Sequence, residues 1–395
     1  MTSSEPLAQG PALPPSKRRG IAALRNAGHG ANDLYWYILP PVLPLILQEF
    51  GLRYAAAGGM IAAYLSMIAV ASMLTGRLSD RVHRGRLIGF SFLLASLALF
   101  ASAVMPRLPL VIGFLVLAGI GVSTYHPAAY ASIHDAGQGK GRTYGAFEAS
   151  GSLAIIAMLA LQGLLVARIG WRGVIVVGAI PGALMGMLLL AAPRLSFGDR
   201  LAPHPAEAGT LLSAGFVVGV MLRILGVNAL QNFAPTYLVR AVRMDPGIAA
   251  FAMGFTFAGA MCGAIVMGRA ADRRGAFPVY VLSSGLLAPL VPLLSLHMPA
   301  AAYPVLLFLV GFCSSACFPA QSMILAELSG SRGKGSVFGL LMGATALTAA
   351  ASPLLFGLVA DAAGLVTAVR ACALPVTAGW IVTIVVWRAL RARSR

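Results

Sequence analysis

Five ionisable side chains stand in long apolar stretches of the sequence: His29, Asp33, His126, Glu148 and Arg223. A charged group at the centre of a bilayer costs about 2.5–3.5 kcal/mol on insertion scales, so it normally faces a partner or a wet cavity. An acid buried without a partner titrates near neutral pH, whereas a nearby cation keeps it ionised. We therefore expect Asp33 to carry a proton or bind a substrate, or else to form a structural pair with a neighbouring helix.

Arg223 is the basic member of this set. A guanidinium group binds carboxylate or phosphonate oxygens in pairs and stays charged at any biological pH, so it suits a small organic anion. The alternative is that Arg223 neutralises Asp33 or Glu148. Glu148 itself is predicted to be either a second proton site or a carboxylate at the membrane surface.

His29 and Asp33 are four residues apart, so they share one face of a helix, and His126 is expected to approach that face. Imidazole and carboxylate groups together suit a transition metal. No third strong ligand is evident, so we predict no metal site and keep a divalent-metal exporter as an alternative. Further substrate contacts are expected from imidazole, aromatic and amide groups in the same apolar stretches: His29, Asn32, Tyr35, Trp36, Tyr125, His126, Asn228, Gln231 and Asn232.

The elements that position these groups follow from composition. Of 395 residues, 58% are apolar and only 10% are charged, against about 25% charged in a soluble domain, which excludes a soluble enzyme. Apolar runs long enough to cross a bilayer number twelve. Their approximate ranges are 21–47, 55–75, 87–105, 110–133, 144–167, 174–192, 211–238, 248–266, 279–296, 303–325, 337–360 and 366–387. The predicted fold is an all-α membrane protein with twelve transmembrane helices.

The net charge of +17 comes from Lys and Arg in short clusters between the apolar runs, and the distribution of these clusters predicts the orientation of the chain in the membrane. One side holds about three times as many as the other, so both termini are expected in the cytoplasm of a bacterial-type inner membrane. We expect contact with lipid, no nucleic acid, and a monomer. The run Pro40-Pro41-Val42-Leu43-Pro44 cannot form a regular helix and should bend the outer part of the first span.

The chain also repeats itself. Gly76, Asp80 and Arg81 recur 192 residues later as Gly268, Asp272 and Arg273, and further landmarks follow at the same or nearly the same shift. Such a repeat predicts two six-helix bundles that rock about a midplane cavity. The expected segments are a disordered tail (1–20), a first bundle (21–192), a cytoplasmic linker (193–210), a second bundle (211–390) and a basic tail (391–395).

The loop Gly76-Arg77-Leu78-Ser79-Asp80-Arg81 resembles the signature of the major facilitator superfamily of secondary transporters, and its second copy begins at Gly268. The resemblance implies that these loops latch the two bundles together, through Gly76, Asp80, Arg81, Gly268, Asp272 and Arg273. Within that superfamily, His29-Gly30-Ala31-Asn32-Asp33 and Tyr125-His126-Pro127 are similar to motifs of the fosmidomycin-resistance exporters, which implies a role in drug resistance.

The sequence has no nucleotide-binding loop and no nucleophile elbow, so we predict neither an enzyme nor a cofactor. The favoured function is proton-coupled efflux, or antiport, of a small anionic or amphiphilic compound by alternating access. Asp33 and Glu148 would carry protons and Arg223 would hold the substrate. Because the fifth span lacks the proline motif common in antiporters, proton-symport uptake stays an alternative, as does a scaffold without transport.

Overall fold

The computed structural model describes residues 15–79, 82–129, 141–192, 211–328 and 334–393, and this part of the chain is helical, with no strand. The helices of the first half are α1 (Pro15–Trp36), α2 (Leu43–Glu49), α3 (Tyr54–Ser79), α4 (Arg84–Val104), α5 (Leu108–Val122) and α7 (Gly141–Ala191). Those of the second half are α8 (Leu211–Arg240), α9 (Pro246–Arg274), α10 (Ala276–Leu293), α11 (Ala302–Leu328), α12 (Lys334–Ala363), α13 (Leu365–Ala371) and α14 (Ala373–Arg393).

These helices account for the twelve predicted spans. Ten described helical stretches are long and apolar enough to cross a membrane. The longest of them contains two spans, which meet at Gly170, where φ is 64° and ψ is −178°, a backbone conformation that essentially only glycine adopts. The first span is formed by α1 and α2. Helix α1 begins at Pro15, inside the segment expected to be a tail (1–20). Proline is well tolerated in the first turn of a helix, so it suits this position.

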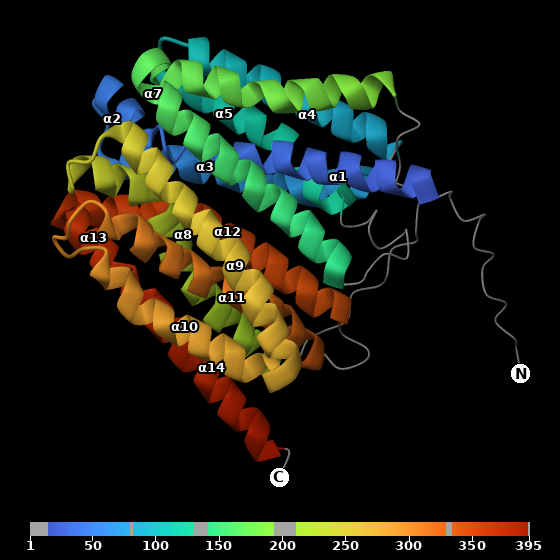
Figure 1. Cartoon of the computed structure of the whole chain (residues 1–395), viewed down its shortest axis with the longest axis vertical. Helices are drawn as coiled ribbons and strands as arrows, with labels where there is room; N and C mark the ends of the chain where they lie inside the picture. The colour runs from blue at the N-terminus through green and yellow to red at the C-terminus, as the bar shows by residue number, and fades with distance from the viewer. Residues whose placement is uncertain (1–14, 80–81, 130–140, 193–210, 329–333, 394–395) are drawn as a thin grey trace, which may run out of the picture.

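The helices form two bundles, one from α1 to α7 and one from α8 to α14 (Figure 1). Within the first bundle α7 packs on α1 and α4, and within the second α8 packs on α12 and α14. Two seams join the bundles: α3 lies against α12, and α7 lies against α9. The repeat in the sequence thus appears as two related bundles with two equivalent seams.

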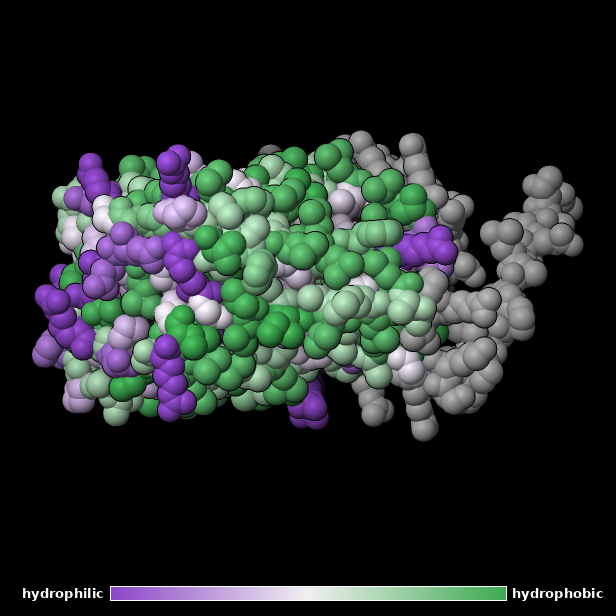
Figure 2. Space-filling view, turned by 90° about the horizontal axis from the view of Figure 1, so that it is seen from above, coloured by the Kyte–Doolittle hydropathy of each residue, from purple (hydrophilic) through white to green (hydrophobic). Residues whose placement is uncertain are grey.

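We call the end of the molecule that holds α2 and α13 the distal end, because it lies away from the start of α1 and the end of α14 (Figure 1). Figure 2 shows hydrophobic residues over the middle of one face and hydrophilic residues gathered at the distal end. This distribution fits a protein whose middle lies in hydrocarbon.

Proline residues break two helices near the candidate site. Helix α1 ends at Trp36, and residues 37–42 form turns before α2, as the proline run predicts. Pro127 has no N–H for the carbonyl of Ser123, and the helix turns at residues 123–124. The Ser72 hydroxyl on α3 lies 3.1 Å from that carbonyl and shares its one hydrogen with the carbonyl of Ile68, at 2.7 Å. The break places His126 beside α1.

Candidate functional site

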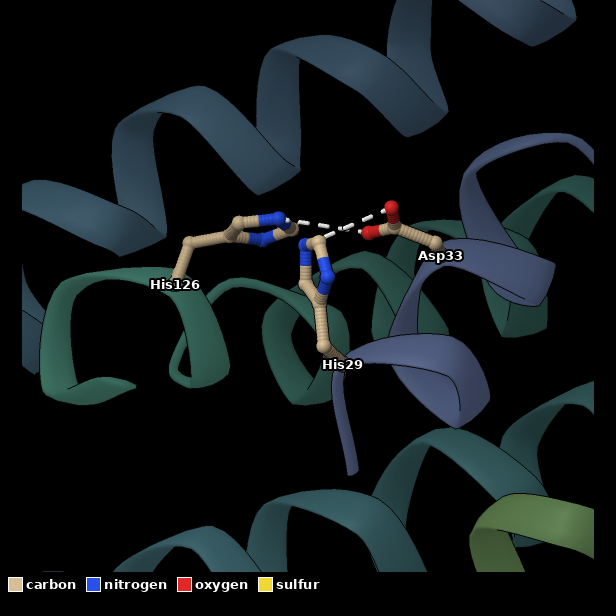
Figure 3. Close-up of side chains that lie close together, drawn as sticks. All are labelled: His29, Asp33 and His126. Carbon is tan, nitrogen blue, oxygen red and sulfur yellow. Dashed lines mark ion pairs between the residues drawn. The ribbon is translucent and has the colours of Figure 1, made fainter. Parts of the chain in front are cut away.

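Three of the predicted residues lie together in the first bundle, and Figure 3 shows both imidazole rings directed at one carboxylate. His29 Nε2 is 3.4 Å from Oδ2 of Asp33, and His126 Nε2 is 3.2 Å from Oδ1. The two histidines come from separate helices, since His29 lies on α1 and His126 follows the break after α5. Asp33 therefore bridges two elements of the bundle.

A second layer of contacts fixes both rings. His29 Nδ1 donates to the backbone carbonyl of Phe147 at 2.7 Å, and the His29 ring stacks on the Phe147 ring with centroids 3.7 Å apart. The amide nitrogen of Asn32 donates to Nδ1 of His126 at 3.1 Å. Each imidazole thus has its Nδ1 occupied and presents its Nε2 to Asp33.

These contacts determine where protons can sit. A carbonyl only accepts, so Nδ1 of His29 must carry hydrogen, and a neutral His29 would then direct the lone pair of Nε2 at a carboxylate. The contact is favourable only if one further proton lies between His29 and Asp33. His126 differs, because its Nδ1 accepts and its Nε2–H donates to Asp33 while the ring stays neutral.

The packing around the cluster is tight on one side and open on the other. A Cβ atom on Gly151 of α7 would lie 2.2 Å from Asp33 Oδ2 and 2.8 Å from His29 Cε1, so a side chain there would displace the carboxylate and press on the imidazole ring. The His29 side chain is 1% exposed, whereas Asp33 and His126 are 17% and 28% exposed. Asp33 and His126 therefore form the accessible edge of the cluster.

The same geometry bears on the metal alternative. One ring nitrogen of each histidine and one carboxylate oxygen lie within 4.8 Å of one another, a spacing that a divalent transition metal also accepts. The metal and proton hypotheses therefore concern the same three side chains.

The aromatic residues predicted near the site divide into two groups. The Trp36 ring meets the His126 ring edge-on, with centroids 5.9 Å apart, and so lines the cluster. Tyr35 and Tyr125 instead use their hydroxyl groups inside the first bundle: Tyr35 bonds to the Ser96 hydroxyl, and Tyr125 donates to the carbonyl of Arg25. In this state both tyrosines hold helices together.

Arg223 lies in the second bundle and does not meet Asp33. Its guanidinium donates to the Tyr280 hydroxyl at 3.2 Å, the Gln321 side-chain oxygen at 3.2 Å and the Ser314 carbonyl at 3.4 Å. Its side chain is 1% exposed, and the rings of Tyr280 and Phe318 lie within 6 Å of it. Among the described residues these partners are all neutral, so Arg223 is not locked to an acid here.

The remaining predicted contacts are more dispersed. Asn228 accepts at its side-chain oxygen from Asn232 and from Ser352, both at 3.0 Å, which ties α8 to α12. Gln231 is partly exposed on the same helix. Glu148 is exposed on α7, next to Phe147, and its charge acts on His126. The two halves of the expected site are thus present on separate bundles.

The expected latch residues are only partly described. Asp80 and Arg81 lie outside the described residues, and Gly76 belongs to the last turns of α3. In the second copy Gly268 lies on α9, and Asp272 and Arg273 are exposed in its last turn. Their proposed role in holding the bundles therefore stays a prediction.

Sequence reasoning missed residues that complete both sites. Phe147 and Gly151 support His29 and Asp33, while Tyr280 and Gln321 hold Arg223. A glycine in the middle of the fifth span was a usable signal for close helix approach. The partners of Arg223 could not be recognised from the sequence, because a tyrosine or a glutamine in a long apolar stretch is common in membrane helices.

Comparison with known proteins agrees with this architecture. A model of the Major Facilitator Superfamily matches residues 27–213 and 216–395. A putative metabolite transport protein of Haemophilus influenzae is 24% identical over 65% of this chain and 68% of its own. A gentisate transporter of Corynebacterium glutamicum is 26% identical over 79% of this chain and 74% of its own.

A solved structure shows the same fold. A bacterial homolog of the human lysosomal transporter Spinster, in an inward-facing and occupied conformation, superposes with a TM-score of 0.82. It is 15% identical, and the match covers 95% of this chain and 98% of that one.

Proposed function

Because the chain belongs to the Major Facilitator Superfamily, we propose that it is a secondary transporter that exports a small organic anion in exchange for protons. Under this proposal the His29–Asp33–His126 cluster holds the proton, and Arg223 holds the anion. The similarity of its two short motifs to fosmidomycin-resistance exporters supports export, and the same motifs contain His29, Asp33 and His126.

The observation that carries the proposal is the hydrogen-bond pattern around His29. Its Nδ1 is committed to the carbonyl of Phe147, so the contact between its Nε2 and Asp33 needs a bound proton. A buried group that must hold a proton in one conformation and can release it in another is what proton coupling requires. The partly exposed edges of Asp33 and His126 supply the path by which that proton exchanges.

The anion site follows from Arg223. Its present acceptors are a hydroxyl, an amide oxygen and a carbonyl, each a weaker partner than an anionic oxygen. A carboxylate or phosphonate that displaced Tyr280 and Gln321 would give the guanidinium a charged partner. The rings of Tyr280 and Phe318 beside it favour a guest with an aromatic or apolar body. The similarity to a gentisate transporter points to the same class, an aromatic carboxylate.

The cycle that we propose links the two sites through the bundles that carry them. The excess of Lys and Arg on the opposite side places the distal end outside the cell in this proposal. A proton would then enter from outside and neutralise the pair of His29 and Asp33. Its release into the cytoplasm would restore the charge of the cluster. The anion bound at Arg223 would travel the other way as the two bundles rock.

The test is flux in proteoliposomes with an imposed pH gradient, using radiolabelled gentisate as the carboxylate probe and fosmidomycin as the phosphonate probe. We expect wild-type protein to move at least one probe against its gradient, towards the side of higher proton concentration. Asp33→Asn should abolish gradient-driven flux, and Arg223→Ala should weaken probe binding. Asp245→Asn, which keeps a helix cap, and Arg388→Ala, at an exposed position, are the matched controls.

Other results would contradict the proposal in specific ways. Net flux of the probe along with protons would identify a symporter instead. Flux of Mn²⁺ or Zn²⁺ that is lost in His29→Ala, without flux of either organic probe, would favour the metal exporter. If no probe is transported, the hypothesis of a scaffold without transport activity is the one that remains.

A further inference from the structure

Helices α3 and α9 both begin at the distal end, one on each seam, and are equivalent in the repeat. Their first turns are capped differently. Helix α9 begins at Pro246, and the carboxylate of Asp245, directly before it, accepts from the backbone N–H groups of Gly247 and Ile248 at 2.8 and 3.2 Å. This is a cap supplied by the same chain segment. The equivalent residue in the first half, 192 positions earlier, is Arg53, which cannot accept a hydrogen bond.

The first turn of α3 receives its cap from the other bundle instead. The two carboxylate oxygens of Asp361, near the end of α12, accept from the backbone N–H groups of Tyr54 at 2.9 Å and Ala55 at 3.0 Å. Arg53 Nε lies 3.5 Å from the same carboxylate, but its side chain is 80% exposed, so this ion pair is weak. The Asp361 side chain is only 9% exposed and is thus committed to α3.

Close packing makes this cap dependent on contact between the bundles. A Cβ atom on Gly58 of α3 would lie 2.2 Å from the carbonyl oxygen of Pro353, and one on Gly357 of α12 would lie 2.3 Å from that of Tyr54. The two backbones therefore touch with no side chain between them. If α3 and α12 separate by even a few ångströms, both hydrogen bonds of Asp361 are lost, because such bonds fail beyond about 3.5 Å.

We propose that Asp361 is a positioning residue that holds the distal end closed by capping α3 across the two bundles. Opening the distal end leaves two N–H groups of α3 without their acceptor, since the first half has no cap of its own. The cap of α9 survives the same motion, because Asp245 moves with its helix. The cap of α3 by Asp361 thus depends on the conformation, whereas the cap of α9 by Asp245 does not. This difference does not depend on which substrate is transported.

The experiment measures the distance across the distal end by pulsed electron–electron double resonance. Spin labels are placed at Arg107→Cys and His297→Cys, which are exposed in loops of the two bundles, in a background with the four native cysteines replaced by alanine. The full-length protein is reconstituted in nanodiscs. In the parent protein the short, closed distance should dominate. Asp361→Ala should raise the ratio of open to closed molecules about tenfold, which is the effect that losing a helix cap implies.

A double variant separates gating from helix stability. Arg53→Asp gives α3 the cap that α9 has naturally, so Arg53→Asp combined with Asp361→Ala should recover the melting temperature but keep the open distribution. Arg53→Asp alone should also open the distal end, because the introduced carboxylate accepts from the N–H groups at the start of α3 and repels Asp361. This single variant tests the proposal even if Asp361→Ala fails to fold. Asp245→Ala should lower the melting temperature without changing the distance distribution.

Two results would overturn the proposal. If the distance distribution of Asp361→Ala matches that of the parent, the cap does not hold the distal end. If the double variant recovers the closed distribution together with the melting temperature, Asp361 only stabilises α3.

Discussion

Gly151→Ala is the smallest change that should break proton coupling without removing an ionisable group. The added Cβ would lie 2.2 Å from Asp33 Oδ2, whereas ordinary contact begins at 3.4 Å, so the carboxylate must move by about 1.2 Å. The contacts of Asp33 with His29 and His126 are 3.4 and 3.2 Å long and cannot both survive such a shift. Misplacement of reacting groups by about 1 Å costs on the order of 100-fold in rate.

The assay compares two kinds of flux of radiolabelled gentisate in proteoliposomes. Flux driven by a pH gradient should fall by about two orders of magnitude in Gly151→Ala. Exchange of labelled for unlabelled gentisate at equal pH should persist, because it needs no proton. Alanine is more favourable than glycine in a helix by about 1 kcal/mol, which offsets part of the strain, and the melting temperature measured beside the flux shows that the fold is kept. Gly113→Ala, at a site with open space around it, is the matched control.

The reasoning would be refuted by gradient-driven flux in Gly151→Ala that equals that of Gly113→Ala. A parallel loss of both kinds of flux would also count against it, because this would show a general defect in substrate binding and not in coupling.

Three further changes test the surrounding structure. Burial raises the pKa of Glu49, but hydrogen bonds from Arg172 and Trp171 and the charge of Arg172 lower it by more, so the net shift is downwards. Glu49→Gln should therefore reduce the melting temperature at pH 7. The difference from the parent protein should shrink as the pH falls below about 4.5. Ser72→Ala should destabilise the protein by about 1 kcal/mol in denaturant unfolding, because it removes the hydroxyl hydrogen that the carbonyls of Ile68 and Ser123 share. Gly163→Ala should shift the spin-label distances towards the open distal end, because its Cβ would lie 2.7 Å from the carbonyl oxygen of Gly247.

The sequence predicts those features of the fold that depend on local pattern. The span count follows from apolar run length, and the break after Trp36 follows from the prolines. The pairing of His29 with Asp33 follows from a spacing of four on one helix. Each of these needs information from only a few neighbouring residues.

Contacts between distant segments were not predictable in the same way. Arg223 was expected either to bind a substrate anion or to neutralise Asp33 or Glu148, and its partners in the structure are neutral side chains and a carbonyl 57 to 98 residues further along the chain. The cap of α3 by Asp361 joins residues more than 300 positions apart. No periodicity encodes such pairs, because they depend on which helices become neighbours.

The arrangement of charge on the two bundles yields a final prediction about energetics. If a monovalent anion leaves on Arg223 while one proton enters on the His29–Asp33 pair, two elementary charges move in the same electrical sense. Each charge is worth about 2.3 kcal/mol per 100 mV, so an inside-negative potential contributes about 4.6 kcal/mol per 100 mV to export, enough for a concentration ratio of about 10³. Symport of the same anion with one proton would move no net charge. A potassium diffusion potential set by valinomycin at equal pH should therefore drive gentisate out of the negative compartment in wild-type proteoliposomes, and a flux that ignores the sign of that potential would exclude exchange of one anion for one proton.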